Sequence, residues 1–212
     1  LRVQMMAGRL DEARVQLQKL RGQYPDSLAL RLLQGNILSL EGKEQEAIAV
    51  YRRILEENPG ELIVIQRLYS ALQEVGEQER ASALLSQALD ADPQSRQLQI
   101  LRALEHERDG EYEEAIRIYE ELYARNPNDV AVANNLASVL AYYRESEADV
   151  ERAHQISLRL AGSNQPEFQD TLGYVQLRRG DVDEAILNLQ AAARGLPGNP
   201  TIAFNLAMAY AA

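Results

Sequence analysis

A spacing of 34 residues recurs along this chain and restricts the folds that it can adopt. The same three residue types return at this interval in four successive copies. The glycines are Gly8, Gly42, Gly76 and Gly110, the alanines are Ala13, Ala47, Ala81 and Ala115, and the prolines are Pro25, Pro59, Pro93 and Pro127. The phase then shifts by two residues before Gly180, Ala185 and Pro197 resume it. A fixed period of this length over 212 residues predicts an array of stacked structural units.

Each unit of the array carries two amphipathic segments. In residues 28–40 the apolar side chains recur at helix spacing, and residues 44–57 carry a second stripe of the same kind. Gly42 between them suits the left-handed backbone that ends a helix, and Pro59 stops the second helix. A two-helix hairpin of this size cannot bury its own apolar face, so neighbouring hairpins must stack. The sequence therefore predicts an all-α fold.

This pattern resembles the tetratricopeptide repeat. The family motif has a small residue in the first helix, Gly at the turn, Ala and an aromatic residue in the second helix, and then Pro. Here the motif reads Gly35, Gly42, Ala47, Tyr51, Pro59; then Ala103, Gly110, Ala115, Tyr119, Pro127; and later Gly173, Gly180, Ala185, Leu189, Pro197. The resemblance covers essentially the whole chain and implies a right-handed superhelical solenoid of about six repeats. Tyr69 places a bulky ring where the family usually has Gly or Ala, so we expect a splayed hairpin there.

The period divides the chain into one array of unequal pieces. We expect a partial repeat at 1–27, full repeats at 28–61, 62–95, 96–129, 130–165 and 166–199, and the first helix of a truncated repeat at 200–212. Neither end carries the polar capping helix that stacked repeats usually need. We therefore expect an interior fragment of a longer array, with uncapped ends that can pair with another copy to form a homo-oligomer.

The fifth repeat replaces the glycine turn with the longer stretch "AYYRESEADVERA" (141–153). If Ala153 fills the fixed alanine position, its hairpin loop is about four residues longer than the others. Ser146 and Asp149 have the spacing of a capping box, which predicts the start of the second helix. Tyr142 and Tyr143 then end the first helix beside this loop. They are either partly packed rings next to a tolerated insertion or a contact point for a partner.

Composition and motifs exclude several function classes. The 32 acidic residues against 22 basic ones give a net charge of -10, which disfavours a nucleic-acid partner. The longest apolar runs are too short for a membrane helix, so we expect no membrane insertion of this segment. Cysteine is absent, and the two histidines, His106 and His154, fall in different repeats. Without metal-ligand spacing, a phosphate-binding loop or a nucleophile elbow, the sequence predicts a protein that is not an enzyme and holds no metal or cofactor.

The resemblance also implies where a partner binds, because the first helices of such arrays line a concave groove. One groove position carries Asn in some family members, and here it reads Leu33, Arg67, Leu101, Asn135, Thr171 and Asn205. Further groove positions add Asn36, Gln66, Ser70, Asn134, Ser138, Asp170 and Tyr174, and Tyr142 joins them as a candidate contact. Amides suit peptide recognition because each offers donors and an acceptor. The alternative is that several of these side chains cap or bridge adjacent helices.

The acidic pairs on the second helices, such as Glu120 and Glu121, are expected to form a solvated outer face. The overall hypothesis is a scaffold that binds a protein or peptide partner in its groove. "NNLA" at 134–137 before "DTLG" at 170–173 resembles bacterial tetratricopeptide proteins linked to exopolysaccharide export and exosortase systems, which implies an envelope or export assembly. Two alternatives stay open: the substrate-recognition arm of a larger enzyme such as a glycosyltransferase, and a self-associating structural array.

Overall fold

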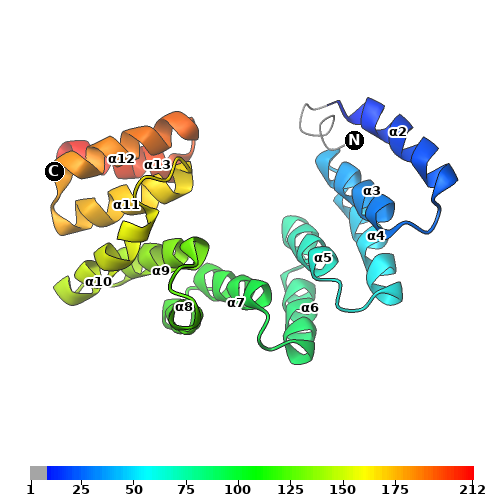
Figure 1. Cartoon of the computed structure of the whole chain (residues 1–212), viewed down its shortest axis with the longest axis horizontal. Coiled ribbons are helices and arrows are strands. Elements are labelled where there is room, and N and C mark those ends of the chain that lie inside the picture. The colour runs from blue at the N-terminus through cyan, green and yellow to red at the C-terminus, as the bar shows by residue number, and fades with distance from the viewer. Residues whose placement is uncertain (1–8) are drawn as a thin grey trace. The chain divides into compact units, whose positions relative to one another are not determined.

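The computed structural model describes residues 9–212, and the chain falls into two compact units, Leu1–Leu98 and Gln99–Ala212. Within the described range there are twelve α-helices, one 3-10 helix and no strand (Figure 1). They are α2 (Leu10–Gln23), α3 (Leu28–Leu40), α4 (Glu44–Glu57), α5 (Leu62–Glu74), α6 (Gln78–Ala91), α7 (Arg96–Arg108), α8 (Tyr112–Arg125), α9 (Val130–Tyr143), α10 (Glu147–Ser157), η1 (Leu158–Leu160), α11 (Pro166–Arg179), α12 (Val182–Gly195) and α13 (Pro200–Ala211). The all-α prediction is confirmed. Gly8, the first glycine of the period, lies outside the described residues.

The first unit stacks antiparallel hairpins in chain order. Helix α2 packs on α3, α3 on α4, α4 on α5 and α5 on α6, and the first helices α3 and α5 also touch each other. Leu17 of α2 and Ile37 of α3 share one buried cluster. Helix α4 buries its fixed alanine, Ala47, together with Tyr51. Each helix thus buries a stripe against its neighbours, as the 34-residue period predicts.

The second unit continues the same construction. Helix α8 packs on α9, α9 on α10 and α11, and α11 on α12 and α13. Ala103 of α7, Tyr119 of α8, Leu136 of α9 and Val175 of α11 belong to one buried cluster. A further cluster joins α12 to α13 through Leu189 and Ala209. The first helices α9, α11 and α13 therefore form a contiguous row, which positions the candidate site.

Glycine turns join the two helices of most hairpins. Gly42 adopts a φ of 72°, and the Lys43 N–H donates to the Leu38 carbonyl across it at 2.9 Å. Gly180 repeats this geometry with a φ of 93° and an Asp181 N–H to Gln176 carbonyl bond of 2.9 Å. A residue with a Cβ is strained in this left-handed region, so glycine supplies the turn and the long bond closes the helix end. The predicted role of Gly42 is confirmed.

Small residues allow the two helices of a hairpin to approach closely. A Cβ added at Gly35 would lie 2.3 Å from the Tyr51 ring, and one at Gly173 would lie 2.7 Å from Leu189 Cγ. The fixed alanines of the second helices, among them Ala115 and Ala153, have no exposed surface. The departure at Tyr69 is accommodated with the ring buried inside its unit, and the splaying expected there stays a prediction.

The fifth repeat absorbs its extra residues differently from the expectation. Helix α9 ends at Tyr143 and α10 begins at Glu147, so the join is as short as the one between α3 and α4. The extra residues lengthen α9 by one residue and the start of α10 by three, ahead of buried Ala153. Ser146 caps α10 by accepting the Asp149 N–H at 3.1 Å, which confirms the predicted helix start. A good cap and continued backbone hydrogen bonds favour longer helices over a longer loop.

Candidate functional site

All twelve predicted partner-binding residues lie on first helices. Asn36 is on α3, and Gln66, Arg67 and Ser70 are on α5, so these four belong to the first unit. The other eight lie on the row formed by α9, α11 and α13: Asn134, Asn135, Ser138, Tyr142, Asp170, Thr171, Tyr174 and Asn205. The structure therefore separates the predicted residues into two groups, one in each unit.

In the first unit, Asn36, Arg67 and Ser70 line a hollow of about 340 Å³ between α3 and α5. Its floor includes Tyr51, whose hydroxyl donates to Asn36 Oδ1 at 2.9 Å, and burial raises the pKa of this tyrosine. Gln66 is not part of the lining. Arg67 makes no ion pair within the described part of the chain, and the lining of the hollow also includes the carboxylates of Glu44 and Glu74.

In the second unit, Asn205 of α13 joins two other predicted residues, one on α9 and one on α11. Its Nδ2 donates to the Tyr142 hydroxyl at 2.6 Å and to Asp170 Oδ1 at 3.0 Å. Asn205 itself is 0 % exposed, and Thr171 of α11 is 6 % exposed. The amide therefore bridges α9, α11 and α13, as the structural alternative anticipated, and it presents Tyr142 and Asp170, which are half-buried. Burial raises the pKa of Asp170 and raises that of Tyr142 to about 12.

Four tyrosines form a row beside this bridge. The rings of Tyr142 and Tyr174 stack with centroids 4.1 Å apart, and those of Tyr112 and Tyr143 stack at 3.5 Å. Tyr142 and Tyr143 are tilted neighbours, 6.2 Å apart, and link the two stacks. Tyr112 was not predicted, whereas Tyr143 was expected, together with Tyr142, as either a partly packed ring or a contact point. The sequence offers one signal for them: a pair of tyrosines ends the first helix α9, and a tyrosine begins the preceding second helix α8.

A second polar chain runs from α9 towards α7. Asn134 Nδ2 donates to Asn135 Oδ1 at 3.2 Å, Asn135 Nδ2 donates to the Tyr119 hydroxyl at 3.4 Å, and that hydroxyl donates to Glu107 Oε1 at 2.8 Å. Glu107 is half-buried, and burial raises its pKa. Sequence reasoning missed Glu107 because no motif distinguishes it from the many surface glutamates. Ser138, one turn beyond Asn134, is half-buried on the same helix.

The end of α9 is fixed by an arginine from the next first helix. Arg178 of α11 donates from both terminal nitrogens, to the Ala141 carbonyl and to the Arg144 carbonyl. Arg144 has extended backbone, so the turn lacks the left-handed glycine of the other hairpins. The guanidinium supplies donors to carbonyls that a glycine turn would otherwise satisfy. Arg178 is therefore engaged with the backbone next to the tyrosine row.

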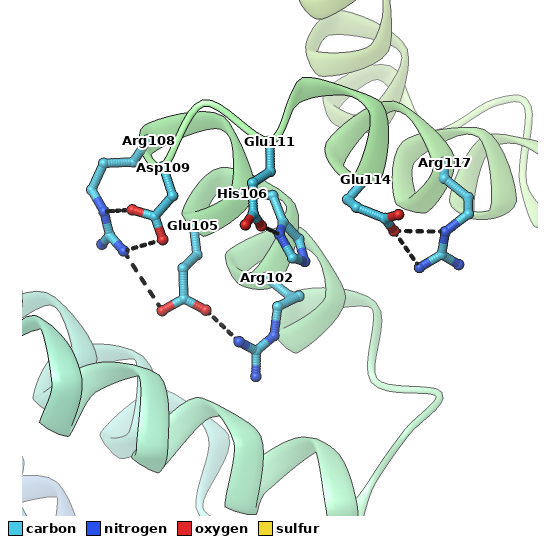
Figure 2. A network of polar contacts seen from close by, with 8 residues as sticks. All are labelled: Arg102, Glu105, His106, Arg108, Asp109, Glu111, Glu114 and Arg117. Carbon is cyan, nitrogen blue, oxygen red and sulfur yellow. Dashed lines mark hydrogen bonds and ion pairs between the residues drawn. The ribbon is translucent and has the colours of Figure 1, made fainter.

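Neither histidine belongs to a recognisable catalytic arrangement. His106 Nδ1 lies 2.5 Å from Glu111 Oε2 at the α7–α8 turn, close to the ion pairs of both helices (Figure 2). His154 Nδ1 is buried on α10 without a hydrogen-bond partner.

Among residues 9–212, no group of three or more metal-ligating side chains is placed to hold an ion. In the same range, no helix combines the length and apolar character needed to cross a bilayer.

Antiparallel hairpins repeated every 34 residues and stacked in chain order within each unit define a helical-repeat solenoid, the architecture of a protein-interaction scaffold. Three family models described as tetratricopeptide repeat match the sequence, one over residues 38–104, one over 96–139 and one over 2–61 and 171–212. The chain belongs to the tetratricopeptide repeat family. No curated protein matches it significantly by sequence.

Solved structures share this fold at low sequence identity. A tetratricopeptide repeat protein from Parabacteroides merdae is 17% identical with a TM-score of 0.72, and the match covers 98% of this chain and 80% of that one. Yeast Tom70 is 15% identical with a TM-score of 0.73, covering 92% of this chain but 42% of its own. YrrB, described as having an unusual peptide-binding site, is 14% identical with a TM-score of 0.53, covering 89% and 96%. Such identities show a common fold alone.

Proposed function

We propose that this chain is a non-catalytic adaptor that binds an extended segment of a partner protein along the first helices of its second unit. The observation that carries the proposal is the bridge made by Asn205. Because Tyr142 accepts a hydrogen bond from Asn205, its own hydroxyl hydrogen remains available to a ligand acceptor. Asp170 accepts from the same amide through one oxygen, which leaves its second oxygen for a donor. A donor and an acceptor held side by side complement a peptide backbone.

The neighbouring groups support the same assignment. The stacked rings of Tyr142 and Tyr174 provide rigid amphipathic area, which lowers the entropic cost of binding. Asn134, Asn135 and Ser138 extend the polar surface along α9. In the first unit, the hollow lined by Arg67 offers a separate polar contact. The buried Asn205 and Thr171 act as supports in this proposal.

Site-specific photocrosslinking tests the groove. A benzophenone amino acid placed at Tyr174 is expected to capture a partner segment, whereas the same group at Glu121 on the outer face of α8 should not. A peptide of the captured segment should then bind wild-type protein more tightly than Tyr142→Phe. The expected loss is about 0.5–1.5 kcal/mol, the net value of one hydrogen bond. If the group at Glu121 crosslinks equally well and Tyr142→Phe binds the peptide as tightly as wild type, the partner docks on the outer helices and the groove assignment is wrong.

We also propose that the partner belongs to a bacterial envelope or export assembly. The support is the order of the "NNLA" and "DTLG" units, at 134–137 and 170–173, on the two helices that carry the tyrosine row and Asp170. Fractionation of the native host, followed by immunodetection of the full-length protein, tests this assignment. A protein found wholly in the cytosol, without envelope proteins among its crosslinked partners, would refute it.

Self-association is a second candidate, favoured by α13. Phe204 and Met208 lie one turn apart on this helix and are 62% and 48% exposed. No described helix covers them, and large exposed apolar side chains at helical spacing suit a partner helix. Light scattering across a concentration series should show association that Phe204→Glu abolishes. A protein that stays monomeric at high concentration excludes this role.

A further inference from the structure

Two carboxylates of the second unit are partly removed from solvent without a compensating cation. Asp170 and Glu107 are both half-buried, and each is hydrogen-bonded through one oxygen to an uncharged group, the Asn205 amide and the Tyr119 hydroxyl. Burial raises the pKa of both carboxyls, and no basic side chain opposes that effect. Two exposed carboxylates show the opposite effect: Arg31 lowers the pKa of Glu57, and Arg108 lowers that of Asp109.

The contrast is sharpest within a single helix. Glu105 of α7 is 4 % exposed, yet Arg102 and Arg108 of the same helix form ion pairs with it (Figure 2). Glu107, two residues further along, has no such pair. Helix α7 therefore pairs the buried Glu105 with two arginines. It leaves Glu107, which accepts a hydrogen bond from Tyr119, without a counter-ion. A desolvated carboxylate without a cation is costly, and an incoming cation would recover that cost.

Both carboxylates remain accessible to a ligand. Their second oxygens make no hydrogen bond to the protein, and neither is among the fully buried side-chain atoms without a partner in the described residues. Basic side chains close to the tyrosine row are already engaged. Arg178 donates to the Ala141 and Arg144 carbonyls, and Arg144 pairs with Glu113. The chain therefore supplies no cation to Asp170 or Glu107.

A second, independent feature marks the Asp170 site as built for a ligand. Asn205 has no exposed surface, and its Oδ1 has no hydrogen-bond partner, although its Nδ2 is fully used by Tyr142 and Asp170. A buried amide oxygen without a partner lies beside the carboxylate, so the local acceptors exceed the local donors. A guanidinium or ammonium group brings several donors and a positive charge, and aromatic rings nearby add favourable cation–π contacts.

We infer that the groove of the second unit selects partner segments that carry arginine or lysine, with Asp170 receiving one basic side chain and Glu107 another. This inference rests on the proposed groove function and names the chemistry of the partner. The tyrosine row adjoins both carboxylates: Tyr142 contacts the Asn205 bridge, and its neighbour Tyr143 has a pKa raised by burial and also by the nearby charge of Glu107. Asp170 and Glu107 are thus specificity determinants, and the backbone contacts of the groove are shared by any segment.

The test uses the whole chain and a matched pair of peptides. One is a short acetylated, amidated peptide of alternating alanine and arginine, and the other replaces each arginine with its uncharged isostere, citrulline. Calorimetric titration of wild-type protein should show the arginine peptide binding about tenfold more tightly, as expected for at least one charge-assisted hydrogen bond. Asp170→Asn and Glu107→Gln should each lower the affinity for the arginine peptide more than the affinity for the citrulline peptide, so that each variant reduces the preference.

Matched controls separate the possible outcomes. Asp170→Asn keeps an acceptor for Asn205, so its melting curve should show an intact fold. Glu121→Gln on α8 removes the same charge from an exposed outer position and should change affinity by less than about twofold. Equal binding of the two peptides, or an equal loss in Glu121→Gln, overturns the cation preference. If both peptides still lose affinity in Tyr142→Phe, groove binding survives that failure; if no groove substitution matters, both proposals fall.

Discussion

Gly173→Ala is a sharp test of the close helix approach that this fold requires. A methyl group at this position would lie 2.7 Å from Leu189 Cγ and 3.2 Å from the Ala185 carbonyl oxygen on the facing helix. A side-chain rotation of Leu189 cannot relieve the contact with backbone, so α11 and α12 must separate slightly. Overpacking of this kind costs about 1–3 kcal/mol. Alanine recovers up to about 1 kcal/mol of helix propensity over glycine, so we expect a net loss of up to about 2 kcal/mol.

Gly22→Ala is the matched control because it is the same chemical change without the contact. Gly22 lies in α2, and no atom stands within 4 Å of a Cβ built there. The propensity gain is then unopposed, and this variant should be as stable as wild type or slightly more stable. Urea titration followed by circular dichroism should shift the midpoint downwards for Gly173→Ala alone. A midpoint for Gly173→Ala equal to that of Gly22→Ala would refute the packing argument.

Three further predictions concern the register of the repeats, the half-buried carboxylate of Asp170 and helix α13. Ala115→Leu should lose about 1–3 kcal/mol because Ala115 is 0% exposed, whereas Glu113→Leu should change stability by less than about 0.5 kcal/mol; equal melting temperatures would contradict the register. Burial raises the pKa of Asp170, so its ionisation destabilises the fold as pH rises from the unfolded to the folded pKa. Asp170→Asn should therefore have a larger free energy of unfolding than wild type at neutral pH, and urea titrations should show that this difference disappears below about pH 3.5. A difference that does not change with pH would exclude ionisation of Asp170 as its cause. A polar capping helix added after Ala212 should raise the free energy of unfolding and reduce self-association. If neither changes, the exposed face of α13 does not drive association.

The architecture was predictable because each constraint lies within one repeat. Gly42 and Gly180 mark turns through a backbone conformation that other residues rarely adopt, and that signal is visible in any single sequence. Ala153 could be assigned to the fixed position by spacing alone, and Ser146 by its capping pattern. Such local signals do not depend on where distant residues lie. The division of the chain within α7 had no counterpart in the sequence, which repeats without a break there.

The candidate site was less predictable because its contacts join residues far apart in the chain. Asn205 reaches Tyr142 and Asp170 from a different hairpin, and the sequence pattern alone could not distinguish a groove amide from a buried bridge. The role of Arg178 as a cap for α9 likewise needs the next first helix in place. The extra residues of the fifth repeat were assigned to a loop because the spacing to Ala153 is about four residues longer than in the other repeats. Helix continuation competes with loop formation, and only the position of the Ser146 cap decides between them.

Asp170 shows why folding requirements alone do not explain the site. Its hydrogen bond to Asn205 needs an acceptor, which an asparagine side chain would also provide without the cost of burying a charge. The same reasoning applies to Glu107, since a glutamine oxygen would accept equally well from the Tyr119 hydroxyl. A carboxylate in place of an amide therefore adds negative charge where the fold gains nothing from it. That charge becomes favourable once a positive group from another molecule is placed against it, and the groove's preference for a basic segment follows from this asymmetry.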